Sequence, residues 1–173
     1  MDFSSRNWQS SIRGTVAVHQ QYSNLRDWEG QETTDLVYLD RHGALTGYLR
    51  RHCIESFPSQ ILLDHNHQTC PIEYFLEVKS TPGNSRTRFY MSDAQYKRVC
   101  AENACDQRDD RLTVKQMETM SQSLSRGRFQ VYVILRISDL LTPRVKPDIF
   151  VDPLRFKGSL LNFEAEKWYV TMR

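Results

Sequence analysis

Two side chains of opposite charge, Glu77 and Lys79, stand two positions apart at the end of the apolar and aromatic segment Ile72–Lys79. Branched and aromatic residues in this density predict a β-strand, on which side chains two apart lie on the same face. The carboxylate of Glu77 can bind a hard cation such as Mg²⁺ through oxygen. The ammonium of Lys79 can orient a water molecule or stabilise charge on a phosphate. The pair therefore suggests metal-assisted phosphate chemistry.

A second carboxylate is needed, because a single protein side chain rarely holds Mg²⁺ alone. Asp35 begins the segment Asp35–Asp40, which is apolar, short and bounded by charge, and which predicts a buried strand. Asp64 is the other candidate, and it ranks second because it lies in the polar turn 64–68, where aspartate is common for conformational reasons. In the alternative interpretation, Asp35 is simply the first residue of a strand and binds no metal.

The elements that must position these residues follow from hydrophobic periodicity, turn residues and caps. Ser92 and Gln95 have capping-box spacing, which predicts a helix from Asp93. Phe129–Ile137 is the strongest strand and should be central. Further elements are expected as follows: a turn at 41–43, a helix over 44–55, a strand at 61–63, a loop at 81–85, a strand at 88–91, a polar insert at 106–111, a helix from 113 that Gly127 ends, and a strand at 149–151 closed by Asp152 and Pro153. We expect Pro143 and Pro147 to interrupt regular structure.

This order of elements predicts an α/β fold with a mixed central sheet of four to six strands flanked by helices. The mixed character is expected because helical crossovers allow parallel pairing. With 173 residues the chain is long enough for a single domain. We divide it into a polar arm over 1–34, a core over 35–153 and a tail over 154–173. Trp8, Tyr22 and Trp28 are isolated aromatic anchors in the arm, which shows no persistent period and is expected to be extended or built of short edge elements.

Composition excludes several classes of protein. Hydrophobic residues make up 39% and charged residues 25%, as in a globular chain. The longest apolar run is Val131–Leu135, far too short for a membrane helix, and no signal peptide is evident, so we expect an intracellular protein without membrane contact. The net charge of +2 is too small to indicate a nucleic-acid binder by itself.

Organic cofactors and zinc find no support in the sequence. The seven glycines are scattered singly and form no phosphate-binding loop. The four cysteines show no C-x-x-C pair and are expected to be small buried residues or unreactive thiols. The string His65-Asn66-His67 spells a nuclease motif, but that motif needs a much longer hairpin-and-helix unit, so the match is discarded.

A strand with Glu-x-Lys, after a strand with Asp and before a helix with a polar residue, resembles the PD-(D/E)xK restriction-endonuclease-like superfamily. More narrowly, the chain resembles the NO VEIN C-terminal domain family, and in its early segments the fungal branch of that family. The segments that carry the likeness are Asn7–Arg13, Thr34–Asp40, Tyr74–Gly83, Phe89–Gln95, Val131–Arg136 and Phe150–Pro153. They are individually short, and their order along nearly the whole chain makes the case.

The resemblance implies a restriction-endonuclease-like fold that lacks the usual first helix, which in relatives bears Gly-x-x-Gly-Glu. It also implies that Asp35 and Glu77 hold Mg²⁺ or Mn²⁺, that Lys79 positions the attacking water, and that Gln95 is the polar residue of the helix. Gln95 can fill this role and complete its capping box only if its side chain turns towards the sheet; the cap is the favoured interpretation. Nucleic acid is the implied partner, and the resemblance implies either a shortened gene product or a separated fragment of a larger multidomain protein.

Each of these interpretations has a plainer alternative. Glu77 and Lys79 can be an exposed pair on a half-buried strand, since a short motif recurs by chance. Five basic residues against one acidic residue over 79–98 could contact phosphates, but a charge run is more often a solvated face. Arg136, inside an apolar strand, should find an acidic neighbour if it is buried. Two functions therefore remain: a metal-dependent nuclease, or a non-catalytic module of the same fold that binds protein or nucleic acid.

Overall fold

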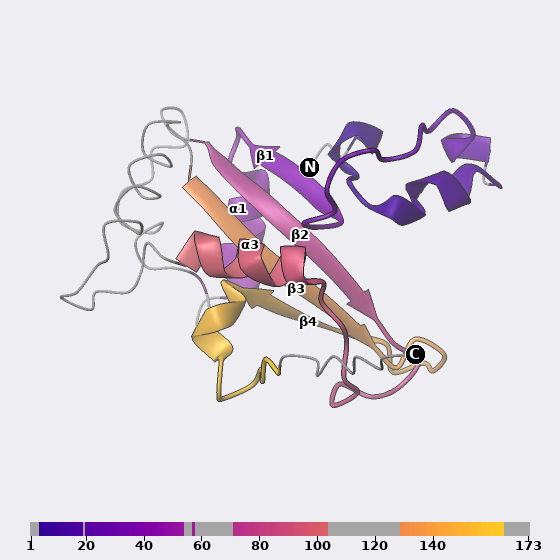
Figure 1. Cartoon of the computed structure of the whole chain (residues 1–173). Helices are drawn as coiled ribbons and strands as arrows, with labels where there is room; N and C mark the ends of the chain where they lie inside the picture. The colour runs from indigo at the N-terminus through magenta and orange to yellow at the C-terminus, as the bar shows by residue number, and fades with distance from the viewer. Residues whose placement is uncertain (1–3, 19, 54–56, 58–70, 104–128, 165–173) are drawn as a thin grey trace, which may run out of the picture.

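A computed structural model describes residues 4–18, 20–53, 57, 71–103 and 129–164 (Figure 1). The regular elements of the core are β1 (Leu36–Asp40), α1 (Ala44–His52), β2 (Ile72–Ser80), α3 (Asp93–Asn103), β3 (Phe129–Ser138) and β4 (Lys146–Val151). Short 3₁₀ helices precede and follow them, at Ser5–Asn7, Ser11–Val18, Gln20–Tyr22 and Pro153–Phe156.

The four strands form one mixed sheet in the order β1-β2-β3-β4. β2 and β3 are parallel, whereas β1 and β4 are antiparallel to their neighbours. The chain leaves β2, passes through α3 and returns to β3, which is the kind of helical crossover that parallel pairing requires. The predicted α/β class, the mixed sheet and the central position of β3 are therefore confirmed.

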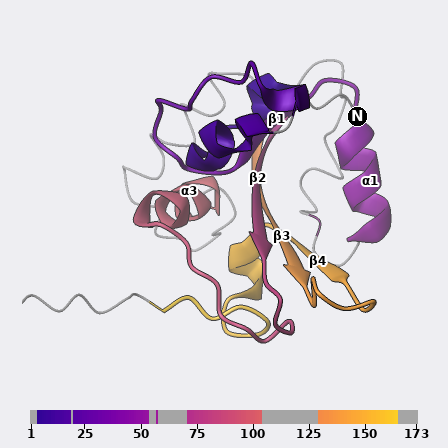
Figure 2. The ribbon, with the colours of Figure 1, turned by 90° about the vertical axis from the view of Figure 1, so that its right-hand side faces the viewer.

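The two helices lie on opposite faces of the sheet, as the edge-on view in Figure 2 shows. Alternation along the strands gives each face its own core. The α1 face buries Leu45, Leu49, Cys53, Phe57, Ile72, Tyr74, Val131, Val133 and Val151. The α3 face buries Phe75, Val99, Tyr132 and Ile134, with Val37, Phe89, Met91, Phe150 and Leu154 packed around them. Because the odd-numbered positions of β2 point to the α3 face, Glu77 and Lys79 point there too.

The start of α1 depends on the last residue of β1. Gly43 adopts the left-handed conformation (φ 70°) in the predicted turn and offers no side chain as a cap. The buried carboxylate of Asp40 takes that role, accepting hydrogen bonds from the backbone N–H of Ala44 and Thr46 at 2.9 and 2.7 Å. The helix ends at His52, three residues before the predicted boundary at residue 55.

Two sequence predictions are wrong. Residues 88–91 form no strand, because both sides of β2 are already paired and this segment crosses the α3 face, where Phe89 and Met91 pack into the core. Pro147 lies inside β4, which an edge strand tolerates because its outer N–H groups need no partner. The arm, expected to be extended or built of short edge elements, consists of short 3₁₀ helices, and Trp8 pairs with Leu36 at the edge of the sheet and packs edge-on against Tyr22.

Several predicted features lie outside the described residues: the strand at 61–63, the turn with Asp64, the insert at 106–111, the helix from 113 to Gly127 and residues 165–173 of the tail. Within the described part of the chain, no helix is long and apolar enough to cross a membrane.

Candidate functional site

Glu77 and Lys79 form a close ion pair on the α3 face, with Lys79 Nζ 2.6 Å from Glu77 Oε1. The prediction that β2 would place both side chains on one face is confirmed. Their surroundings differ from an exposed surface pair, because the Glu77 side chain is only 1% exposed and that of Lys79 is 18% exposed. Charged groups are rarely buried to this extent without a specific partner, so the plainer interpretation as a solvated pair does not hold.

Gln95 completes its capping box and also turns its side chain towards the sheet. Its backbone N–H donates to Ser92 Oγ at 3.1 Å and its Oε1 accepts from the Ser92 N–H at 2.8 Å, which is the predicted capping box. At the same time its Nε2 donates to Glu77 Oε1 at 2.8 Å. The side chain is 5% exposed and turned towards the sheet. The first turn of α3 thus delivers an amide to the buried carboxylate.

Asp35 reaches the same neighbourhood from the residue before β1. The antiparallel register pairs Leu36 with Leu76, so one step further Asp35 stands opposite Glu77. Its Oδ2 accepts a hydrogen bond from the Val78 backbone N–H at 2.8 Å. The structure therefore brings Asp35 beside Glu77, and also gives its carboxylate a structural role in joining β1 to β2.

Burial raises the pKa of Glu77 above its ordinary value. Desolvation is the largest cause, and the negative charge of Asp35 acts in the same direction. The hydrogen bond and charge of Lys79 oppose the shift without cancelling it. A perturbed carboxyl next to a specific cation is characteristic of functional sites, although structural ion pairs produce it as well.

Two further residues belong to this cluster and were missed by sequence analysis. The Tyr132 hydroxyl, on β3, lies 3.4 Å from Glu77 Oε2 and 3.3 Å from the Thr33 carbonyl. Burial and the charge of Glu77 raise the pKa of this hydroxyl, so it remains a donor. The alternation of β3 could have placed Tyr132 on the α3 face, but nothing local indicated its partner.

Glu32 comes from the arm, at a position without any motif. Its carboxylate accepts hydrogen bonds from Ser10 Oγ at 3.2 Å and from the Ser11 N–H at 2.9 Å. Partial burial would raise its pKa, but these hydrogen bonds and the nearby charge of Lys79 lower it overall. The arm therefore contributes a carboxylate whose charge acts on Lys79.

The carboxylate oxygens of the cluster are of the ligand type that Mg²⁺ prefers. Glu77 Oε1 is engaged by Lys79 and Gln95, Oε2 lies 3.4 Å from the Tyr132 hydroxyl, and the carboxylate also interacts with the Asp35 backbone N–H. Asp35 supplies the second carboxylate, and Mg²⁺ commonly takes one or two carboxylates and completes its shell with water. Among the described residues, no group of three or more His, Cys, Asp or Glu side chains is arranged to hold a metal.

The basic residues over 79–98 do not form one surface. Lys79 is engaged by Glu77, Lys97 pairs with Asp93 on the exposed side of α3 at 2.6 Å, and Arg98 lies over the Phe75 ring at 3.8 Å. Most of this charge run is therefore a solvated face or internal packing, as the sequence favoured.

Comparison with known proteins found no matching family model, curated protein or solved structure.

Proposed function

We propose that the protein hydrolyses phosphodiester bonds in nucleic acid with the help of Mg²⁺ or Mn²⁺, and that its architecture is restriction-endonuclease-like. The observation that carries this proposal is the buried Glu77–Lys79 pair with the Gln95 amide on it. A carboxylate 1% exposed, on a strand next to the acidic Asp35, is energetically costly for a purely structural role.

In this proposal each side chain has a separate task. Asp35 and Glu77 hold the cation, which would stabilise the negative charge that develops on the phosphate. Gln95 and Tyr132 donate hydrogen bonds to Glu77 and so fix the direction of its oxygens. Lys79, whose ammonium is the most accessible group of the pair, orients the attacking water and interacts with a phosphate oxygen.

A specific observation supports a second candidate, a non-catalytic module of the same fold. Lys79 lies 2.6 Å from Glu77 and neutralises it, so the pair is already complete without a cation. In this candidate the Glu77–Lys79 ion pair stabilises the fold, and the surface of the domain binds protein or nucleic acid.

Plasmid nicking with and without Mg²⁺ or Mn²⁺ separates the two candidates. We expect the purified full chain to nick plasmid DNA only with the metal, and Lys79→Ala to reduce the rate at least about a hundredfold, because general positioning and charge stabilisation are worth this much. Lys157→Ala, which removes an exposed lysine far from the pair in sequence, is the matched control and should keep the wild-type rate.

Circular dichroism and thermal unfolding must show that Lys79→Ala is folded. Equal nicking by wild type and Lys79→Ala would exclude the catalytic proposal. Calorimetry gives an independent check, since Mg²⁺ or Mn²⁺ should bind to the wild-type protein and not to Glu77→Gln. No metal uptake by the wild type would leave the non-catalytic candidate.

A further inference from the structure

Arg136 is a buried cation whose hydrogen-bonding capacity is largely unused. The residue is 2% exposed and lies on β3, directly beside Lys79 in the parallel register. Its Nη2 donates to the Thr87 carbonyl at 2.8 Å, and its guanidinium lies over the Phe89 ring at 5.0 Å. Nε and Nη1 have no hydrogen-bond partner among the described residues. Unpaired buried donors cost free energy, so they indicate an interaction that is still to be made.

Asp148 is the acidic neighbour expected from the sequence, but it does not supply a hydrogen bond to Nε or Nη1 of Arg136. Asp148 on β4 stands opposite Arg136 in the register, and its charge partly offsets the lowering of the Arg136 pKa that burial causes. Its carboxylate is instead 3.7 Å from Lys146 Nζ, on the same strand. Asp148 therefore acts on Arg136 at a distance.

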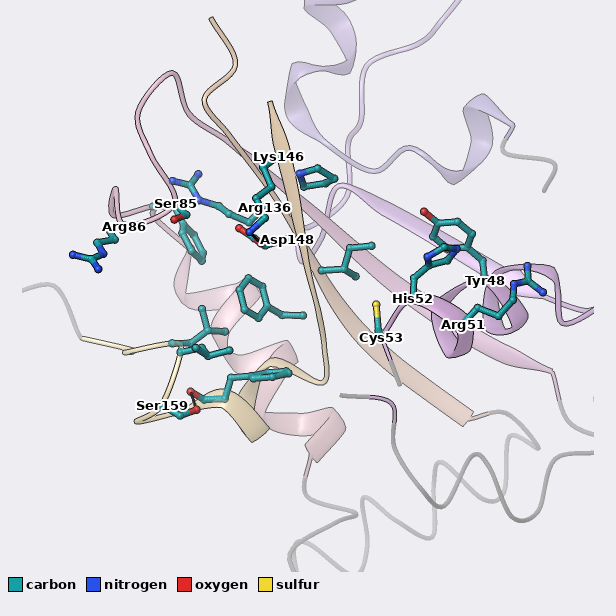
Figure 3. A pocket seen from close by; sticks show the side chains of 17 residues that line it. Tyr48, Arg51, His52, Cys53, Ser85, Arg86, Arg136, Lys146, Asp148 and Ser159 are labelled. Atoms are coloured by element: carbon teal, nitrogen blue, oxygen red, sulfur yellow. Dashed lines mark hydrogen bonds and ion pairs between the residues drawn. The ribbon is translucent and has the colours of Figure 1, made fainter. Parts of the chain in front are cut away.

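Arg136 also lines a pocket that extends around the edge strand β4 (Figure 3). On the Arg136 side the pocket carries Arg86 and Lys146 together with the Ser85 hydroxyl, and on the other side of β4 it reaches Tyr48, Arg51 and His52 of α1. Three cations against the single carboxylate of Asp148 make the Arg136 side of the pocket favourable for an anion.

We propose that Arg136, with Arg86 and Lys146, binds a backbone phosphate of a nucleic-acid strand. The inference rests on the proposed function, because it takes the phosphate to be one next to the group held at Glu77 and Lys79. Lys79 and Arg136 are register partners on adjacent strands, which lie about 4.8 Å apart, so the pocket at Arg136 is close to the Glu77–Lys79 pair, although Lys79 itself does not line it. Nε and Nη1 lie below the pocket surface, and a rotation of the Arg136 side chain or a shift of the exposed Arg86–Thr87 segment brings them to the phosphate.

A nucleic-acid strand fits this pocket better than an acidic peptide does. Phe89, Phe150 and Phe156 line the pocket beside the cations. The combination of phosphates on basic groups with bases against aromatic rings is the common pattern of single-strand binding. The guanidinium also matches the geometry of phosphate oxygens.

The test is fluorescence anisotropy with a short labelled single-stranded DNA, and with RNA of the same sequence, in EDTA so that no cleavage occurs. We expect Arg136→Gln to weaken binding of the preferred strand about tenfold, as for a charge-assisted hydrogen bond, and to lower the salt slope by about 0.7. Arg144→Gln, which removes the same charge from an exposed turn, is the control and should change affinity less than about twofold.

Asp148→Asn keeps the test decisive if Arg136→Gln does not fold. This variant removes the opposing charge, so it should tighten binding about two- to fivefold. Unchanged or weaker binding by a folded Asp148→Asn, or equal losses from Arg136→Gln and Arg144→Gln, would overturn the phosphate site. Failure of the proposed hydrolysis gives a different result. The plasmid then stays intact in the presence of metal, whereas binding of the labelled strand still depends on Arg136.

Discussion

At the scale of single residues, Glu77 is the group on which the proposed chemistry depends. It accepts from Lys79 and Gln95 through one oxygen and lies near the Tyr132 hydroxyl through the other. Burial nevertheless raises its pKa, which means that the loss of hydration on folding outweighs the ion pair and the hydrogen bonds that the carboxylate makes. Its protonation is therefore coupled to the stability of the fold and, in the proposed function, to the binding of a cation.

The raised pKa of Glu77 predicts a specific pH dependence of stability. Above the ordinary value of 4.5 the unfolded chain loses this proton first, so the folded state binds more protons at Glu77. The stabilising contribution is complete below 4.5 and is lost as pH rises through the raised pKa. Glu77→Gln, which does not titrate, should remove this decline. Urea unfolding at a series of pH values measures it, with the exposed Glu29→Gln as control.

A steeper decline in Glu77→Gln than in the wild type would contradict the assignment of the raised pKa to this residue. The same proton also sets the sign for metal uptake, because a carboxylate must be deprotonated to bind a cation. Mg²⁺ or Mn²⁺ binding should therefore strengthen as pH rises through the raised pKa, with proton release that calorimetry in two buffers detects.

At the scale of elements, the first turn of α3 connects helix formation to the site. Ser92 and Gln95 cap the helix reciprocally, and Gln95 also bonds to Glu77 on β2. The cap holds the amide side chain in the orientation that the carboxylate needs. One residue thus contributes to local helix stability and to contact between two elements far apart in sequence.

This double role predicts unequal costs for two alanine substitutions. Ser92→Ala removes the cap alone and should lower the free energy of unfolding by about 1 kcal/mol. Gln95→Ala also removes the amide donor from the buried carboxylate of Glu77, which keeps Lys79 and Tyr132 as partners, and should cost about 2–3 kcal/mol. Urea denaturation measures both, and Ser85→Ala in the exposed loop serves as a control. Equal losses from the two variants would show that the Gln95–Glu77 bond adds nothing to stability.

At the scale of the whole molecule, β2 and β3 are the centre of the fold. Each is paired on both sides, and the sheet that they form separates the α1 and α3 cores. The arm, by contrast, consists of short 3₁₀ helices attached to β1 through contacts such as Trp8 with Leu36 and Asn7 with Val37.

Hydrogen exchange should therefore separate the sheet from the arm. Amides of β2 and β3 open only with global unfolding, whereas those of the 3₁₀ helix Ser11–Val18 exchange through local opening. We expect the strand amides to exchange on the order of a thousandfold more slowly, given typical domain stabilities. Mass spectrometry after pepsin digestion reads both segments. Similar exchange rates for the amides of β3 and of the arm would contradict the expectation that the sheet is the most stable unit.

Much of the fold could be predicted because its signals are local. The alternation of Ile72–Ser80 sets which side chains share a face, and the Ser92–Gln95 spacing sets where α3 begins. A crossover of helical character between two strong strands predicts their parallel pairing. The wrong predictions have long-range causes: residues 88–91 cross the α3 face, where Phe89 and Met91 pack into the core, and Pro147 is tolerated because β4 is an edge strand.

The sequence by itself determined that Glu77 and Lys79 share a face and that Gln95 lies in the first turn of the following helix, because the first follows from strand alternation and the second from the capping-box spacing with Ser92. Only the tertiary structure decided that the pair is buried, that Tyr132 and Glu32 join it, and that Arg136 keeps two donors without partners among the described residues. Burial and partner choice depend on which distant segments pack together, and no local pattern encodes that packing.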